Sequence, residues 1–297
     1  MIDYTYLILY KMFRFILKVL PNFLIIWLMK LIAYFAYFVS IKHRSIIEQN
    51  LRLAFGDTLS LSLKKAIAIG AFRNLVDTTF GIMRRDGMKK SEVIENVTFE
   101  GSEIIQEYIQ NGKIFILITG HYGNWELLSQ AIAIKFNLHL VGVGRKLDSD
   151  IMDRVLKANR ERFNVEMIYK KGAMKGALKA ISQKKILGIL TDQHISSSLS
   201  VDVNFFNHQA THTPLVSILS RKTGLDMISA YISTEDYKHY VVKIYEPIPS
   251  LKTSNQEEDF NKMTQAQATI LEKVIIEKPN QWFWMHKRWK EKFEYEE

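Results

Sequence analysis

A histidine and a glutamate with the chemistry of a proton-transfer pair stand five residues apart, at His121 and Glu126. On a regular helix this spacing would direct the two side chains about 140° apart, so they would not meet. If His121 lies instead in a turn before a helix, its ring can fold back toward the Glu126 carboxylate. Neutral His121 could then remove a proton from a hydroxyl group while Glu126 orients the ring, which is general-base catalysis worth roughly 10²–10⁴-fold in rate. Taken alone, such a pair is more typical of a polar surface turn.

The segments around this pair favour the catalytic interpretation. Residues 114–119 form a continuous apolar run, and residues 125–135 have the pattern of a helix. The pair therefore follows the end of a buried strand, where open α/β sheets place their ligands. Asn124 is expected to cap the helix, and the positive end of the helix dipole would favour Glu126 in the first turn.

Strand-like and helical segments alternate through the rest of the chain. Further strands are expected at 138–143, 165–169, 186–190, 227–233 and 240–245, and helices at 44–56, 60–85, 149–163, 173–183 and 255–277. This alternation, with continuous apolar strands, predicts an α/β fold with a mixed, mostly parallel sheet flanked by helices. The last two strands are expected to be antiparallel neighbours.

The N-terminal forty residues are dominated by Leu, Ile, Phe, Tyr and Trp. Lys11, Arg14 and Lys18 recur at helical spacing, which is typical of a helix lying among anionic headgroups at a bilayer surface. Residues 23–39 would form a helix about 26 Å long, slightly shorter than a hydrocarbon core of roughly 30 Å. Lys30 lies near its centre, where a lysine is costly.

A single membrane span and an in-plane helical hairpin both fit this N-terminal pattern, and hydrophobic helices packed on a soluble domain are the third interpretation. A cleaved signal peptide is disfavoured because basic residues run through the apolar region. Residues 1–40 are therefore expected to be a membrane-associated helical segment, and residues 41–297 the catalytic domain.

Composition excludes several classes of site. The chain has no cysteine, so it has no disulfide framework, thiolate zinc site or cysteine nucleophile. Its formal charge of +9 would attract phosphates of lipid or nucleic acid, or an acidic protein. His208 and His212 have a spacing that could bind zinc from a helical face, but no third ligand is evident and Pro214 follows closely. No metal or organic cofactor is expected.

The region around His121 closely resembles the signature of the late lipid A acyltransferases, the lauroyl/myristoyltransferase family of Gram-negative bacteria. Four later motifs agree in order, and the resemblance covers nearly the whole chain. The matching segments are Thr119-Gly120-His121-Tyr122-Gly123-Asn124-Trp125-Glu126, Gly144-Arg145-Lys146, Asp192-Gln193, Phe205-Phe206 with Ala210 and Thr211, and Gln281-Trp282-Phe283-Trp284-Met285-His286-Lys287-Arg288-Trp289. Asn207 and Gln209 depart from the family's usual glycine and proline, which bears on acyl length or acceptor choice.

The resemblance implies an O-acyltransferase of lipid A and lipopolysaccharide biosynthesis. It would move a fatty acyl group from acyl carrier protein to a hydroxyl of a Kdo–lipid A precursor, with His121 as base and Glu126 as its partner. Arg145 would lie near the reacting carbonyl or the donor's phosphopantetheine, and Asp192 would support the site. The remaining substrate-binding residues are expected to be Lys146, Gln193 and Asn124.

The resemblance also implies a location at the inner membrane, with the catalytic domain on the cytoplasmic side. The C-terminal Trp282, Trp284 and Trp289 could stack nucleic-acid bases, form an interfacial belt or pack in the core. The apolar N-terminus favours a membrane over nucleic acid. A different acceptor, such as a lysophospholipid or glycolipid, is the first alternative function, and a non-catalytic lipid-binding protein of the same fold is the second.

Overall fold

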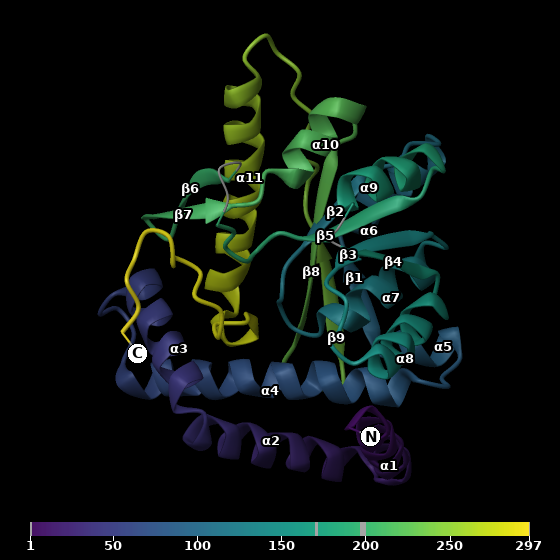
Figure 1. Cartoon of the computed structure of the whole chain (residues 1–297), viewed down its shortest axis with the longest axis vertical. Helices are drawn as coiled ribbons and strands as arrows, with labels where there is room; N and C mark the ends of the chain where they lie inside the picture. Colours follow the sequence, from purple (N-terminus) through teal and green to yellow (C-terminus); the bar gives the residue numbers. More distant parts are fainter. Residues whose placement is uncertain (1, 170–171, 197–199, 297) are drawn as a thin grey trace.

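A seven-stranded sheet forms the centre of the molecule in the computed structural model, which describes residues 2–169, 172–196 and 200–296 (Figure 1). The strand order is β1-β9-β8-β2-β5-β3-β4. The strands are β1 (Val97–Glu100), β2 (Ile116–Thr119), β3 (Leu140–Gly144), β4 (Val165–Tyr169), β5 (Ile186–Leu190), β8 (Met227–Thr234) and β9 (Tyr240–Ile244).

Most neighbouring strands run parallel, as the apolar patterns predict. β2 lies between β8 and β5, with Ile116 in register with Met227 on one side and Leu187 on the other. β8 and β9 are antiparallel, and β1 is parallel to β9. The predicted mixed, mostly parallel sheet is therefore confirmed, as is the expected antiparallel pair at the end of the strand series.

Helices cover both faces of the sheet. They are α3 (Ile41–Phe55), α4 (Leu61–Arg85), α5 (Lys90–Ile94), α6 (Ser102–Gln110), α7 (Trp125–Lys135), α8 (Asp150–Glu161), α9 (Ala173–Ser182), α10 (Leu215–Thr223) and α11 (Gln256–Glu277). Because side chains alternate along a strand, Leu117 packs toward α7 while Ile116 and Ile118 pack toward α9, α10 and α11. This alternation buries β2 on both faces and fixes the position of the turn that follows it.

Two N-terminal helices, α1 (Ile2–Val19) and α2 (Asn22–Val39), meet at Pro21. Figure 1 shows α2 running alongside α4 at the bottom of the view, with α1 seen nearly end-on. One stripe of α2 is buried, from Ile25 to Tyr37 in steps of four residues. The remaining faces of both helices expose many large apolar side chains, together with Lys11, Lys18 and Lys30. By length and composition, α2 is the one helix in the described residues that could cross a membrane.

The short elements are the ones that the sequence pattern does not predict. A separate hairpin, β6 (Val201–Phe205) and β7 (His208–His212), turns at Phe206 and Asn207, which both have positive φ angles. Two residues with positive φ form the tight turn that suits the twist of a hairpin. His208 and His212 therefore lie on a strand and not on one face of a helix. Their spacing of four residues is thus not that of a helical zinc site.

The C-terminal tryptophans belong to the protein core. Trp282, Trp284 and Trp289 are all almost completely buried, against Phe205 and Phe206 of the hairpin turn. The interpretation of these residues as an interfacial aromatic belt is therefore wrong. Indole rings have large apolar surfaces, so their burial in the core stabilises the fold.

Candidate active site

The turn between β2 and α7 is held in a conformation that only glycine allows. Gly123 has a φ of +55°, and a Cβ atom there would lie 2.0 Å from the carbonyl oxygen of Ile232. At Gly120 a Cβ atom would lie 3.1 Å from the side chain of Asp192. The two glycines thus bring the turn against β8 on one side and against the end of β5 on the other, with His121 between them.

His121 is bound by Asp192, in the loop that follows β5. The ring Nδ1 of His121 lies 2.8 Å from Oδ1 of Asp192, and the backbone N–H of His121 donates to Oδ2 at 2.8 Å. The indole Nε1–H of Trp282 donates to the same Oδ2 at 3.0 Å. Parallel strands β2 and β5 end at the same edge of the sheet, which brings these two distant segments of the chain together.

The environment of Asp192 keeps its carboxylate ionised. Burial alone would raise its pKa, but attraction to His121 and hydrogen bonds from His121 and Trp282 lower the pKa to about 2. An ionised Asp192 accepts a hydrogen bond from Nδ1, so that nitrogen carries the proton in neutral His121. The lone pair is then on Nε2, which is the tautomer that a general base requires.

Glu126 has a different partner from the one expected. Its carboxylate is bound by both Nε and Nη2 of Arg160 from α8, with Nε at 2.9 Å from Oε2. From the sequence, Glu126 is expected to hold the ring nitrogen of His121 that does not take the proton, but the structure gives Asp192 this position at Nδ1 and pairs Glu126 with Arg160. The physical reason lies in the turn, which directs His121 toward the loop after β5, while the first turn of α7 directs Glu126 toward α8.

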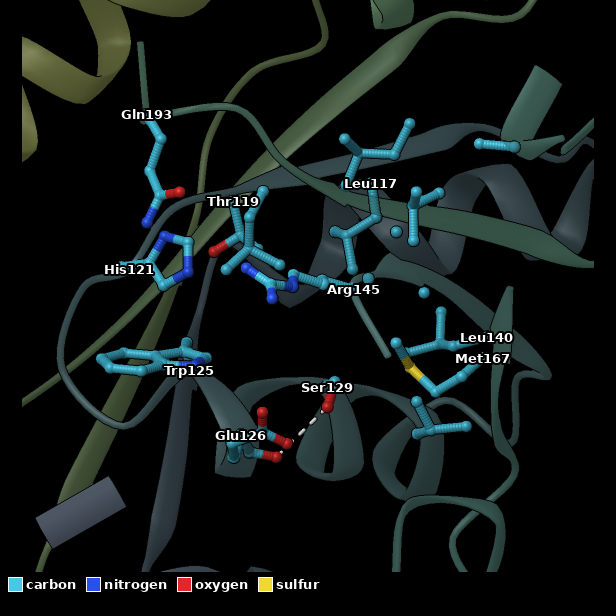
Figure 2. Close-up of a pocket in the computed structure, with 18 of the residues that line it drawn as sticks. Leu117, Thr119, His121, Trp125, Glu126, Ser129, Leu140, Arg145, Met167 and Gln193 are labelled. Carbon is cyan, nitrogen blue, oxygen red and sulfur yellow. Dashed lines mark hydrogen bonds between the residues drawn. The ribbon is translucent and has the colours of Figure 1, made fainter. Parts of the chain in front are cut away.

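His121 opens onto a cavity of about 660 Å³ beneath the edge of the sheet (Figure 2). Figure 2 shows His121, Gln193 and Trp125 at one end, and Leu140 and Met167 at the other. Side chains along the wall are mainly apolar, from β2, β3, β4, β5, α7 and α8. The Glu126–Arg160 pair and Ser129 are among the polar groups of this wall. A mainly apolar cavity with His121 at one end suits a hydrocarbon chain attached to a reactive group.

The other predicted substrate residues divide into two groups. Arg145 and Gln193 line the cavity together with His121. Lys146 does not line it, and its ammonium group instead forms an ion pair with Asp150 at 2.7 Å on the surface. A substrate-binding role for Lys146 is therefore not supported by its position.

Asn124 is a structural residue of the turn. Its side-chain oxygen accepts a hydrogen bond from the N–H of Leu127 at 3.1 Å, so the predicted helix cap is confirmed. Its Nδ2 donates to Asp77 of α4 at 2.9 Å, and the residue is buried away from the cavity that contains His121. The expected substrate-binding role of Asn124 is therefore wrong, because both polar atoms of its amide are used to fix α7.

Residues that the sequence patterns did not mark also support the site. His194 follows Gln193, and both its backbone N–H and its Nδ1 lie within hydrogen-bond distance of Nε2 of His286, at 3.1 and 2.7 Å. Since the backbone N–H can only donate, Nε2 of His286 is an acceptor, and its pKa is lowered to about 4, by burial first and then by His194. This contact fastens the loop that carries Asp192 to the C-terminal segment.

The sequence contains partial signals for these supporting residues. Trp282 and His286 lie in the aromatic C-terminal motif, but nothing in the motif connects them with Asp192 or His194. Arg160 lies in an amphipathic helix with other charged residues, and its pairing with Glu126 has no local signal. Among the described residues, no cluster of three or more His, Cys, Asp or Glu side chains could hold a metal ion.

Comparison with known proteins identifies the family of this chain. The model of the family described as bacterial lipid A biosynthesis acyltransferase matches residues 1–291. The chain belongs to this family. A relative, the lipid A biosynthesis lauroyltransferase of Escherichia coli (strain K12), is 25% identical over 263 residues, which cover 84% of this chain and 79% of that protein.

Among solved structures, this lipid A acyltransferase family member is similar to the 1-acyl-sn-glycerophosphate acyltransferase of Thermotoga maritima. The identity is 15% and the TM-score 0.40, with 86% of this chain and 97% of that chain covered. Membership in the family makes the protein an acyltransferase. The resemblance drawn from the sequence motifs is thereby confirmed.

Proposed function

We propose that this acyltransferase moves a fatty acyl group from acyl carrier protein to a hydroxyl group of a Kdo–lipid A precursor. The observation that carries the proposal is the placement of His121, oriented by buried Asp192, at the end of an apolar cavity of about 660 Å³. Lipid A biosynthesis is the process of the family, and the relative in Escherichia coli is named a lauroyltransferase.

In the proposed reaction the acceptor hydroxyl attacks the thioester carbonyl of the donor. Nε2 of His121 takes the hydroxyl proton as the oxygen–carbon bond forms, and Asp192 stabilises the resulting imidazolium. When the tetrahedral intermediate collapses, the carbon–sulfur bond breaks and the proton passes from His121 to the leaving thiolate. The products are an ester and a free thiol, and the protein forms no covalent intermediate.

The oxyanion that develops on the carbonyl oxygen needs hydrogen-bond donors. Gln193 and Arg145 both line the cavity, and in Figure 2 Gln193 lies beside His121. We assign the Gln193 amide to the reacting carbonyl, and the exposed Arg145 to the carbonyl or to the phosphate of the donor's phosphopantetheine. Glu126 then acts through Arg160 as a positioning residue in the wall of the cavity, not as the partner of the base.

The surface of the protein favours an enzyme that binds the membrane and receives its acyl group from an acidic carrier protein. The outer faces of α1 and α2 expose apolar side chains such as Phe15, Trp27 and Phe35. The packing of α2 along α4 favours helices lying in the plane of the bilayer interface over a single span. We place the catalytic domain at the cytoplasmic side of the inner membrane, where the net charge of +9 attracts acyl carrier protein.

The test is acyl transfer from radiolabelled acyl-carrier protein to a Kdo–lipid A precursor, with the full chain in membranes. Wild type should form the labelled product, and His121→Ala should lose at least about 100-fold in rate. Lys222→Ala, on the exposed end of α10, is the control. Transfer only to a lysophospholipid would show that this lipid, and not the Kdo–lipid A precursor, is the acceptor. Equal rates in wild type and His121→Ala would overturn the mechanism.

A further inference from the structure

A second cavity, of about 310 Å³, lies between α2, α4, the start of α7 and the turn that joins β8 to β9. Its wall has no residue in common with the wall of the cavity that contains His121, among the residues that the structure describes. Asn124, which caps α7, and Leu127 line the second cavity, whereas Trp125 and Leu128 line the first. The first turn of α7 thus separates two distinct sites.

The wall of this second cavity contains several charged side chains. Arg84, Arg85 and Lys238 provide three cationic groups, against the carboxyl groups of Asp77 and Glu92. Both oxygens of Asp77 are already used, since Tyr240 donates to one at 2.8 Å and Asn124 to the other at 2.9 Å. Glu92 accepts a hydrogen bond from the backbone N–H of Lys89. The two carboxyl groups are therefore engaged with other donors.

Arg85 has an unsatisfied donor in this wall. Its side chain is 5% exposed, and its Nε donates to Gln130 at 2.6 Å, but its Nη2 has no hydrogen-bond partner among the described residues. Burial lowers the pKa of Arg85, and the carboxylates of Glu126 and Asp77 oppose this shift. A buried guanidinium N–H without an acceptor is costly, so a ligand that brings an acceptor oxygen to Arg85 would gain this hydrogen bond.

The helix leaves space for this guanidinium. Gly81 lies one turn before Arg85, and a Cβ atom there would be 2.5 Å from Nη1 of Arg85 and 2.9 Å from Nδ2 of Asn124. Arg84, the next residue in the wall, donates from Nη2 to the side-chain oxygen of Asn22 at 2.6 Å, at the start of α2. Two adjacent arginines therefore face the junction between the body and the apolar N-terminal helices.

We propose that this cavity binds the phosphate group of an anionic phospholipid, at a site separate from the acyl-transfer centre. Arginine binds phosphate oxygens through two or more N–H groups, which would satisfy Nη2 of Arg85. The apolar part of the wall includes Ile25, Ile26 and Met29 of α2, and the outer face of this helix exposes apolar side chains such as Trp27 and Phe35. A phospholipid fits this combination because its headgroup carries the charge and its chains can follow α2.

The test measures binding to the detergent-solubilised full chain by titration calorimetry. The ligands are short-chain phosphatidylglycerol, phosphatidylcholine of the same chain length, and inorganic phosphate. Arg85→Gln and the half-buried Arg84→Gln remove the charges, and Lys222→Gln, on α10, is a control with the same change in charge. His121→Ala is included to separate this site from the catalytic one, and circular dichroism monitors the fold of each variant.

We expect saturable binding of phosphatidylglycerol that weakens at least about tenfold in both arginine variants and stays unchanged in Lys222→Gln and His121→Ala. If Arg85→Gln does not fold, Arg84→Gln alone decides the result. Equal binding by wild type and the folded arginine variants would overturn the proposal, as would the absence of saturable binding. Inorganic phosphate that binds as tightly as phosphatidylglycerol, with the same loss in the variants, would overturn the lipid assignment and identify a soluble phosphate as the ligand.

Discussion

Asp192 accepts hydrogen bonds from both the ring and the backbone N–H of His121, and each of these bonds is 2.8 Å long. Two bonds to the same residue fix the plane of the ring relative to the turn that carries it. The tautomer and the orientation of His121 thus depend on one carboxylate in the loop after β5.

Replacing Asp192 with asparagine should lower the rate of acyl transfer by about 10³–10⁴-fold, because the amide no longer selects the tautomer with its lone pair on Nε2. The measurement is kcat under saturating donor and acceptor. Asp57→Asn, at an exposed position after α3, makes the same chemical change away from the site and should leave kcat unchanged. A folded Asp192→Asn protein with wild-type kcat would contradict the assignment of Asp192.

Glu126 and Arg160 should behave as a structural pair. Removing one partner leaves a buried charge, so Glu126→Leu should reduce the free energy of unfolding by about 3–5 kcal/mol. The double variant Glu126→Leu with Arg160→Leu should recover much of this loss, since two apolar groups can replace a buried pair. Chemical denaturation of the single and double variants measures both effects. A stable Glu126→Leu protein without any acyl transfer would instead point to a direct part of Glu126 in the reaction.

Gly188 of β5 lines the acyl cavity, and a Cβ atom there would find no neighbour nearer than the Cδ2 of Leu117 at 4.0 Å. Gly188→Leu should therefore fill part of the cavity and shift the preference toward shorter acyl chains. The measurement is the ratio of kcat/KM for a long and a short acyl donor, compared between wild type and Gly188→Leu. Because the ratio is taken within one protein, it does not depend on the fraction of active enzyme. An unchanged ratio would show that the acyl chain does not pass Gly188.

The stability of the protein should decrease in weak acid because His286 is held neutral. Its folded-state pKa of about 4 lies below the ordinary value of 6.5, so the unfolded chain binds the proton more readily. The contribution is fully present above about pH 6.5 and is lost as the pH falls toward 4. Urea midpoints between pH 7 and 4 should fall less steeply for His286→Asn than for wild type or for the exposed control His43→Asn. Equal slopes would contradict the prediction.

The outer face of α2 should bind the membrane. Trp27→Glu and Phe35→Glu place charges on exposed apolar positions and should reduce flotation with anionic vesicles by at least about tenfold. Leu61→Glu, at an exposed position at the start of α4, is the matched control. If all three variants float like wild type, the membrane surface lies elsewhere on the molecule.

The main strands and helices around the site could be predicted because apolar runs alternate with segments of helical periodicity along this part of the chain. Residues 125–135, 165–169 and 186–190 match the observed α7, β4 and β5 at both ends. The elements β1, β6 and β7 were not predicted because four or five residues of mixed polarity carry little periodic signal.

The partner of His121 could not be predicted from spacing. Local reasoning considers the nearest carboxylate, Glu126, whereas parallel pairing of β2 and β5 brings Asp192 across 71 positions of sequence. The same limit applies to the C-terminal tryptophans. Their pattern alone does not distinguish a membrane belt from a core, and only the packing against Phe205 and Phe206 decides it.

The hydrogen bond from Trp282 to Asp192 has a consequence for biosynthesis. The two residues are 90 positions apart, and the backbone of Phe283 also binds the carbonyl of His121. At roughly 5–20 residues per second, about 5–20 s pass between the synthesis of Asp192 and that of Trp282. During this interval the nascent chain contains His121 and Asp192 but lacks the hydrogen bonds from Trp282 and Phe283. Complete assembly of this site therefore requires residues 281–283 to dock against the turn at His121 and the loop at Asp192.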